Sequence, residues 1–166
     1  MSWLYAVVGL VALQRLAELI WSRRNERRLR DAGALEAGRG HYPFLVLLHA
    51  GWLAAMLLLV PPETMPDLRL LAAYLGVQGL RLWTMASLGR FWTTRILTLP
   101  GAPLVRRGPY RWLRHPNYVV VVAEVALLPL AFGATGIALI FSLANLILLA
   151  VRIRAEEAAL APRRSL

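Results

Sequence analysis

Cysteine is absent from this chain of 166 residues, which excludes disulfide bonds, thiolate metal sites and a cysteine nucleophile. Lysine is absent too, so all 19 basic residues are arginines. The three histidines, His41, His49 and His115, lack the HxxxH spacing of a helical metal site, and no metal is expected. The chain also has no Walker loop, no Gly-x-Ser-x-Gly and no GxGxxG pattern. Those absences argue against nucleotide hydrolysis, a serine triad and a dinucleotide fold.

Hydrophobic residues, in contrast, make up 58% of the chain. Soluble domains contain about 45–50% apolar residues, so this share favours an integral membrane protein, with residues 1–166 forming a single domain. Five segments are apolar enough to cross or nearly cross a bilayer, which needs about 20 residues per helix. These segments are Ser2–Ser22, Tyr42–Val60, Leu68–Leu88, Tyr118–Phe132 and Thr135–Arg152.

The last two apolar segments are separated only by Gly133 and Ala134, and the fourth has only about 15 residues. They are therefore expected to form a tight helical hairpin near the C-terminus, in which the fourth helix need not cross fully. The predicted fold class is all-α, a polytopic membrane helix bundle of about five transmembrane helices.

The arginines predict the orientation of this bundle. Sixteen of the 19 lie after the first apolar segment, between the third and fourth, or in the C-terminal tail. The positive-inside rule then places the N-terminus outside and the C-terminus in the cytoplasm, in a bacterial inner membrane. The net charge of +10 is explained by topology and contact with anionic lipid headgroups, and nucleic-acid binding is not expected.

The segment Gly89–Arg107 differs from the apolar runs. Its side chains alternate with period two between Phe91 and Leu99, and Pro100-Gly101 follows. This pattern predicts a short hairpin or an extended strand on the cytoplasmic face.

The sequence GPYRWLRHPNY, residues 108–118, is the most informative stretch. It gathers prolines, tyrosines, arginines and His115 at the start of the fourth apolar segment. Pro109 and Pro116 restrict the backbone, and Pro116 suits the first turn of a helix. The stretch predicts a polar site at the membrane surface. The alternative is a helix end anchored at the interface by tyrosine and arginine.

Four other groups of polar residues could carry chemistry. Arg152 and Glu156 share one helix face beside Glu157, although a solvated ion-pair patch would look the same. Arg15 and Glu18 form an intramembrane pair, either functional or structural. Glu124 is a lone intramembrane carboxylate that could meet Arg15 or Arg81. His49 is expected to be a packing residue, whereas His41 could line a site at the interface.

The runs LVRRGPYRWLRHPNY and RIRAEEAAL together resemble the isoprenylcysteine carboxyl methyltransferase family of integral membrane enzymes. Phospholipid N-methyltransferases share the Gly-Pro-Tyr…Arg-His-Pro-x-Tyr pattern. Further stretches, including RLAELIWSRRN and WTTRILTLPG, look like a bacterial branch whose members methylate alkylpyrones or alkylresorcinols.

The resemblance implies a cytoplasmic site for S-adenosylmethionine. By position, the cofactor would contact Leu104, Val105, Gly108, Tyr110, His115, Tyr118, Glu156 and Glu157. Carboxylates suit its ammonium group or ribose hydroxyls, and aromatic faces attract its sulfonium. Arg152 or Arg154 is expected to orient the acceptor's oxyanion. His115 could also act as a base, and the catalytic residues are expected to be Arg152, His115 and Glu156. Arg154, Glu124, His41 and Trp92 are expected to contact the acceptor.

The expected function is methyl transfer to an oxygen of a lipophilic acceptor, an alkylpyrone or alkylresorcinol type of lipid. Carboxyl methylation of a prenylated cysteine and N-methylation of a phospholipid stay open as alternatives. A small membrane assembly or transport protein, in which residues 114–118 only anchor a helix, is the non-enzymatic alternative.

Overall fold

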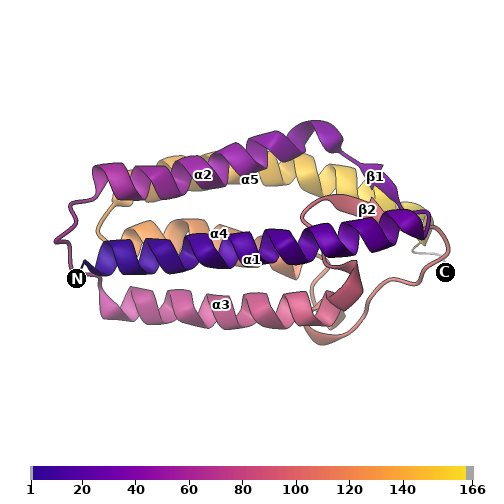
Figure 1. Cartoon of the computed structure of the whole chain (residues 1–166), viewed down its shortest axis with the longest axis horizontal. Helices are drawn as coiled ribbons and strands as arrows, with labels where there is room; N and C mark the ends of the chain where they lie inside the picture. The colour runs from indigo at the N-terminus through magenta and orange to yellow at the C-terminus, as the bar shows by residue number, and fades with distance from the viewer. Residues whose placement is uncertain (1, 164–166) are drawn as a thin grey trace.

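The computed structural model describes residues 2–163, and its five α-helices lie side by side along one long axis (Figure 1). The predicted all-α bundle is confirmed. The helices are α1 (Trp3–Asp31), α2 (Tyr42–Leu59), α3 (Leu68–Leu88), α4 (Pro116–Ala131) and α5 (Thr135–Leu160). The shorter elements are β1 (Leu35–Ala37), η1 (Arg39–His41), η2 (Gly89–Phe91), β2 (Ile96–Thr98), η3 (Gly108–Arg111) and η4 (Ala161–Arg163).

The helix ends follow from local chemistry. Asp67 caps α3 by accepting hydrogen bonds from the backbone N–H groups of Arg69 and Leu70 at 2.8 and 3.2 Å. α2 stops before Pro61-Pro62 because a residue that precedes proline disfavours helical backbone, and Val60 is extended. Pro116 occupies the first turn of α4, as expected from the sequence.

Two helices run further than their apolar segments. α1 continues from Ser22 to Asp31, and α5 continues from Arg152 to Leu160. Neither extension contains proline or glycine, and both are rich in strong helix formers. At 29 residues α1 is about 43 Å long, so its arginine-rich end extends beyond a hydrocarbon core of about 30 Å.

The tight hairpin between α4 and α5 is present as predicted. Gly133 turns the chain with φ +68°, and the Ala134 amide donates to the carbonyl of Pro129 at 2.9 Å. α4 has 16 residues, about 24 Å, and is shorter than the hydrocarbon core.

The period-two segment does contain a strand, but not a hairpin of its own. β2 pairs antiparallel with β1, from the loop between α1 and α2, in the register Leu35↔Thr98 and Ala37↔Ile96. Of the two structures expected for residues 89–107, the extended strand is therefore confirmed, and it pairs with β1 and not within a hairpin of its own. The partner strand is three residues long, too short to show periodicity in the sequence.

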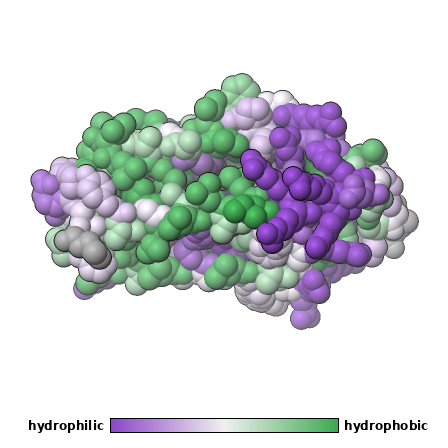
Figure 2. All heavy atoms as spheres, in the orientation of Figure 1, coloured by the Kyte–Doolittle hydropathy of each residue, from purple (hydrophilic) through white to green (hydrophobic). Residues whose placement is uncertain are grey.

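The surface and the core agree with a membrane protein. Within residues 2–163 three helical stretches, Trp3–Asp31, Arg39–Leu59 and Thr135–Arg163, are long and apolar enough to cross a membrane. Figure 2 shows hydrophobic atoms over the length of the bundle and hydrophilic atoms gathered at the end that carries β1 and β2. The buried apolar core, which includes Leu4, Trp52 and Leu128, lies toward the opposite end.

Candidate functional site

Residues 108–118 begin with a glycine that allows them to pack closely against α3. Gly108 has φ +57°, a conformation that favours glycine, and a Cβ there would lie 2.0 Å from Oγ of Ser87. Gly108 thus lets η3 pack closely on α3. The short turn that follows brings His115 to the start of α4, and Trp112 packs edge-on against Trp83 of α3 with ring centroids 6.1 Å apart.

The helical extension of α5 supplies the partners of this stretch. Because α5 stays helical to Leu160, its end carries Arg152, Glu156 and Glu157 into contact with residues at the start of α4. His115 Nε2 lies 2.7 Å from Oε1 of Glu157, and its Nδ1 lies 3.8 Å from Oε2 of Glu156. The two motifs, about 40 residues apart in sequence, therefore form one cluster.

Tyr118 links Glu156 to Arg152. Its ring stacks on His115 with centroids 5.2 Å apart, and its hydroxyl donates a hydrogen bond to Glu156. Arg152 donates from Nε to the Tyr118 hydroxyl at 2.9 Å and from Nη2 to the carbonyl of Thr94 at 2.8 Å. Arg152 is thereby fixed between α4 and the loop before β2.

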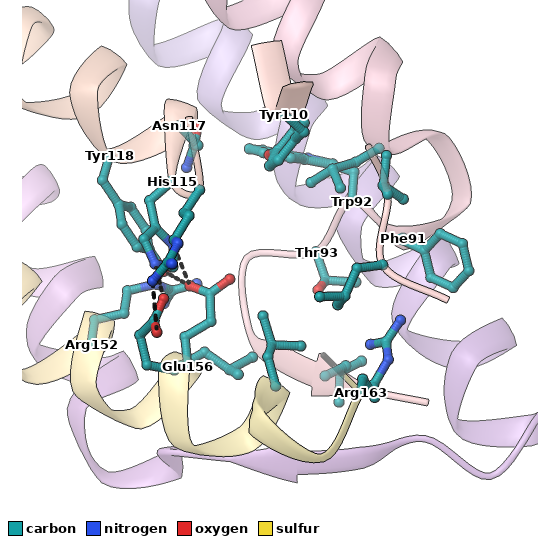
Figure 3. A pocket seen from close by; sticks show the side chains of 18 of the residues that line it. Phe91, Trp92, Thr93, Tyr110, His115, Asn117, Tyr118, Arg152, Glu156 and Arg163 are labelled. Carbon is teal, nitrogen blue, oxygen red and sulfur yellow. Dashed lines mark hydrogen bonds and ion pairs between the residues drawn. The ribbon is translucent and has the colours of Figure 1, made fainter. Parts of the chain in front are cut away.

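These side chains line a cavity of about 370 Å³ (Figure 3), which we call the polar cavity because its lining includes Arg95, Arg106, His115, Glu156, Glu157 and Arg163 beside apolar residues such as Leu104. Small-molecule sites usually fall between about 300 and 1,000 Å³. His115 and the two carboxylates are only 18–28% exposed, so they are sheltered yet reachable. Tyr110 lines the same cavity, and burial, helped by the nearby Glu156 carboxylate, raises the pKa of its phenol. Tyr110 is therefore a neutral hydroxyl at physiological pH.

A second cavity, of about 380 Å³, is lined chiefly by residues of α1 and α2. Leu16, Leu19, Val46 and Leu53 give it a mainly apolar lining. Among residues 2–163, five line both cavities: Trp92, Thr93, Asn117, Tyr118 and Arg152. The two cavities thus meet at one shared wall, which we call the dividing wall.

Four intramembrane charges form a closed ring, and three of them, Arg15, Glu18 and Arg81, line the second cavity. Glu124 accepts from Arg15 at 2.8 Å and from Arg81 at 2.9 Å. Glu18 accepts from the same two arginines at 2.9 and 2.5 Å. We call these four residues the charge quartet. From the sequence, Glu124 was expected to meet Arg15 or Arg81. In the structure it contacts both.

The structure gathers most of the residues expected to bind the cofactor. Those that line the polar cavity are Leu104, Val105, Tyr110, His115, Tyr118, Glu156 and Glu157. Gly108 does not line it within the described chain, because it faces Ser87 instead. Of the two candidate arginines, Arg152 belongs to the dividing wall, whereas Arg154 is exposed, since two residues along a helix turn a side chain to the other face.

Three residues expected to contact the acceptor have different placements. Trp92 is 3% exposed and belongs to the dividing wall, as that expectation requires. Glu124 is 1% exposed inside the charge quartet and lines neither cavity within residues 2–163. His41 is buried against Gly38, and it also lines neither. Burial by neighbouring helices removes both side chains from the cavities.

Sequence reasoning missed Thr93, Thr94 and Asn117. Thr94 joins three segments, because its hydroxyl contacts Ser22 at 3.0 Å and Tyr42 at 3.2 Å while its carbonyl accepts from Arg152. Asn117 lies in the dividing wall, with Oδ1 buried and unpartnered among residues 2–163. Its position inside Arg-His-Pro-Asn-Tyr was the available signal.

Comparison with known proteins agrees with this geometry. The model of the isoprenylcysteine carboxyl methyltransferase family matches residues 70–162, which contain the whole polar cluster. An uncharacterized protein of Bacillus subtilis (strain 168), YpbQ, is 41% identical over 164 residues, covering 96% of each chain. An uncharacterized protein of Haemophilus influenzae is 27% identical over 151 residues, covering 88% of each. No solved structure matches the chain. The chain belongs to the isoprenylcysteine carboxyl methyltransferase family, whose members are membrane methyltransferases.

Proposed function

We propose that this protein transfers a methyl group from S-adenosylmethionine to an oxygen of a lipophilic acceptor, an alkylresorcinol or alkylpyrone type of lipid. One observation carries the proposal: a polar cavity and an apolar cavity meet at the dividing wall. Such a pair suits two reactants of opposite polarity, because each can enter from its own side and meet the other at one point.

The residues of the polar cavity fit S-adenosylmethionine. The carboxylates of Glu156 and Glu157 suit its ammonium group or ribose hydroxyls, and Arg163 offers a cation for its carboxylate. The aromatic faces of Trp92 and Tyr118 suit a sulfonium. When bound, the cofactor supplies an electrophilic methyl group, and no metal or covalent enzyme intermediate is needed.

Arg152 is the residue we assign to the acceptor's oxygen. It belongs to the dividing wall, and its hydrogen bonds to Tyr118 and Thr94 fix its position. A fixed guanidinium there favours the ionised hydroxyl, the better nucleophile, and holds it in line with the methyl group. Within the described chain His115 lines the polar cavity but not the apolar one. Its placement therefore favours cofactor binding over proton removal from the acceptor.

The proposed location is a bacterial inner membrane, with the polar cavity facing the cytoplasm. The hydrophilic end of the bundle in Figure 2 carries most of the arginines, which supports this orientation by the positive-inside rule. The apolar cavity reaches the outer face of the bundle, where Leu16 is 56% and Val46 46% exposed. The acceptor's chain would enter from the bilayer by this route.

The test is methyl transfer by purified protein in lipid nanodiscs, with labelled S-adenosylmethionine and three acceptors in parallel. These are an alkylresorcinol, a prenylated cysteine and phosphatidylethanolamine. We expect label in the alkylresorcinol and loss of transfer in Arg152→Met. Label only in the prenylated cysteine or the phospholipid would replace the proposed acceptor. Failure of S-adenosylhomocysteine to bind in calorimetry would refute the methyltransferase assignment.

A further inference from the structure

We infer that His49 holds a second polar group of the acceptor, a hydroxyl on the same ring as the methylated oxygen. This inference rests on the proposed function and deepens it, because it names a feature that the acceptor must carry. From the sequence, His49 is expected to be only a helix-packing residue. The structure instead places its ring in the lining of the apolar cavity.

The hydrogen bonding of His49 leaves one ring nitrogen available. Nδ1 lies 2.8 Å from the carbonyl of Leu45. Because a carbonyl only accepts, Nδ1 carries the proton, and Nε2 of the neutral ring is an acceptor. Within residues 2–163, Nε2 has no hydrogen-bond partner. A partly exposed ring with a free acceptor in an apolar cavity is suited to a ligand's hydroxyl.

The same bond directs the His49 ring along α2 toward Tyr42. The ring nitrogen meets the carbonyl of Leu45, which lies between the two residues in the sequence. Tyr42 contacts Thr94, whose carbonyl binds Arg152. His49 follows Tyr42 by seven residues, two helical turns, so both side chains lie on one face of α2. Both line the apolar cavity together with Thr94 and Arg152, so one acceptor in that cavity can meet His49 and Arg152.

The surroundings of His49 also fit an acceptor with two polar positions. Arg15, Glu18 and Arg81 of the charge quartet line the same cavity, and Nε of Arg15 is buried with no partner among the described residues. A cavity built only for a hydrocarbon chain would gain nothing from this polar side. The apolar side, with Leu16 and Val46, leaves a separate path for the chain.

His49 is assigned to recognition, not to the chemical step. It does not line the polar cavity, whereas the residues of the dividing wall line both. The inference therefore predicts an effect on the choice of acceptor, and no effect on cofactor affinity.

The experiment compares a 5-alkylresorcinol with the 3-alkylphenol of the same chain length, which differ by one hydroxyl. Binding to the full-length protein in detergent is measured by tryptophan fluorescence, since Trp92 lines the cavity, and transfer is measured in parallel. We expect the wild type to bind the resorcinol about tenfold more tightly, the effect of one hydrogen bond. His49→Phe should abolish that preference, and His49→Gln, which keeps an acceptor, should restore part of it.

Equal binding of the two lipids by the wild type, or an unchanged preference in His49→Phe, would overturn the inference. The binding measurement separates it from the proposed function. A His49-dependent preference without any methyl transfer would contradict the proposed function and still support the hydroxyl contact at His49. Methyl transfer without a His49-dependent preference would do the reverse. Calorimetry with S-adenosylhomocysteine checks that each variant is folded, because cofactor affinity should not change.

Discussion

Two ionic clusters in this protein use the same residue types for different ends. The charge quartet joins two arginines and two glutamates from α1, α3 and α4, and its side chains are 1–16% exposed. The cluster of His115, Glu156 and Glu157, with Tyr118 and Arg152, lies at the hydrophilic end, and its histidine and carboxylates are 18–28% exposed. Every charge in the quartet faces two opposite charges, whereas the second cluster borders a cavity.

The difference separates a structural role from a binding role. In a low-dielectric interior an unpaired charge is costly, so the closed quartet ties three helices together, and among the described residues it leaves the buried Nε of Arg15 without a partner. Partly exposed carboxylates keep lone pairs that a ligand can use at low desolvation cost. Balance and exposure, not residue type, distinguish the two clusters.

The largest expected effect comes from unbalancing the quartet. Arg81→Met leaves two carboxylates facing only Arg15, and we expect the free energy of unfolding to fall by about 3–5 kcal/mol. Denaturant titration in detergent micelles measures this loss. The double variant Arg81→Met/Glu124→Leu restores the balance and should recover most of the stability. A double variant as unstable as the single one would contradict the structural role.

In the second cluster, loss of a charge should weaken ligand binding and leave the stability of the fold unchanged. Glu156→Gln removes a charged partner from the polar cavity, so we expect affinity for S-adenosylhomocysteine to fall about 10–100-fold while thermal stability is unchanged. Calorimetry measures the affinity. Glu63→Gln, an exposed carboxylate outside both clusters, is the matched control and should leave affinity intact. Unchanged affinity in Glu156→Gln would exclude this carboxylate from the cofactor site.

Glu36 combines features of the two clusters. Its own side chain is buried, at 4% exposed, as in the quartet, whereas its partner Arg30 is exposed. Burial opposes its ionisation, but hydrogen bonds from Arg30 and Arg95 outweigh burial and hold the pKa of Glu36 below its usual value. A lowered pKa stabilises the fold above the unfolded value of about 4.3, and this stabilisation is lost as pH falls through the folded pKa.

We therefore expect the thermal midpoint to drop on acidification from about pH 5 to about pH 3, and this drop to shrink in Glu36→Gln. The effect is the smallest of the three because the arginines around Glu36 are 34–71% exposed and screened by water. Asp31→Asn, an exposed acid nearby, is the control. An identical acid profile in Glu36→Gln and wild type would remove Glu36 from the stability of the β1–β2 region.

The sequence by itself determined the membrane class, the five helices and the tight hairpin, because apolar runs, Pro61, Gly133 and Asp67 act locally on the backbone. It also identified Arg-His-Pro-Asn-Tyr and Glu156-Glu157 as polar stretches, since polar residues at the ends of apolar helices stand out.

Tertiary structure decided which polar residues meet. The pairing of β1 with β2, the choice of Arg152 over Arg154, the burial of Glu124 and the exposure of His49 to a cavity all depend on how helices distant in sequence pack together. Sequence spacing specifies a face of one helix, but only packing determines whether that face meets an opposite charge, a neighbouring helix or a cavity.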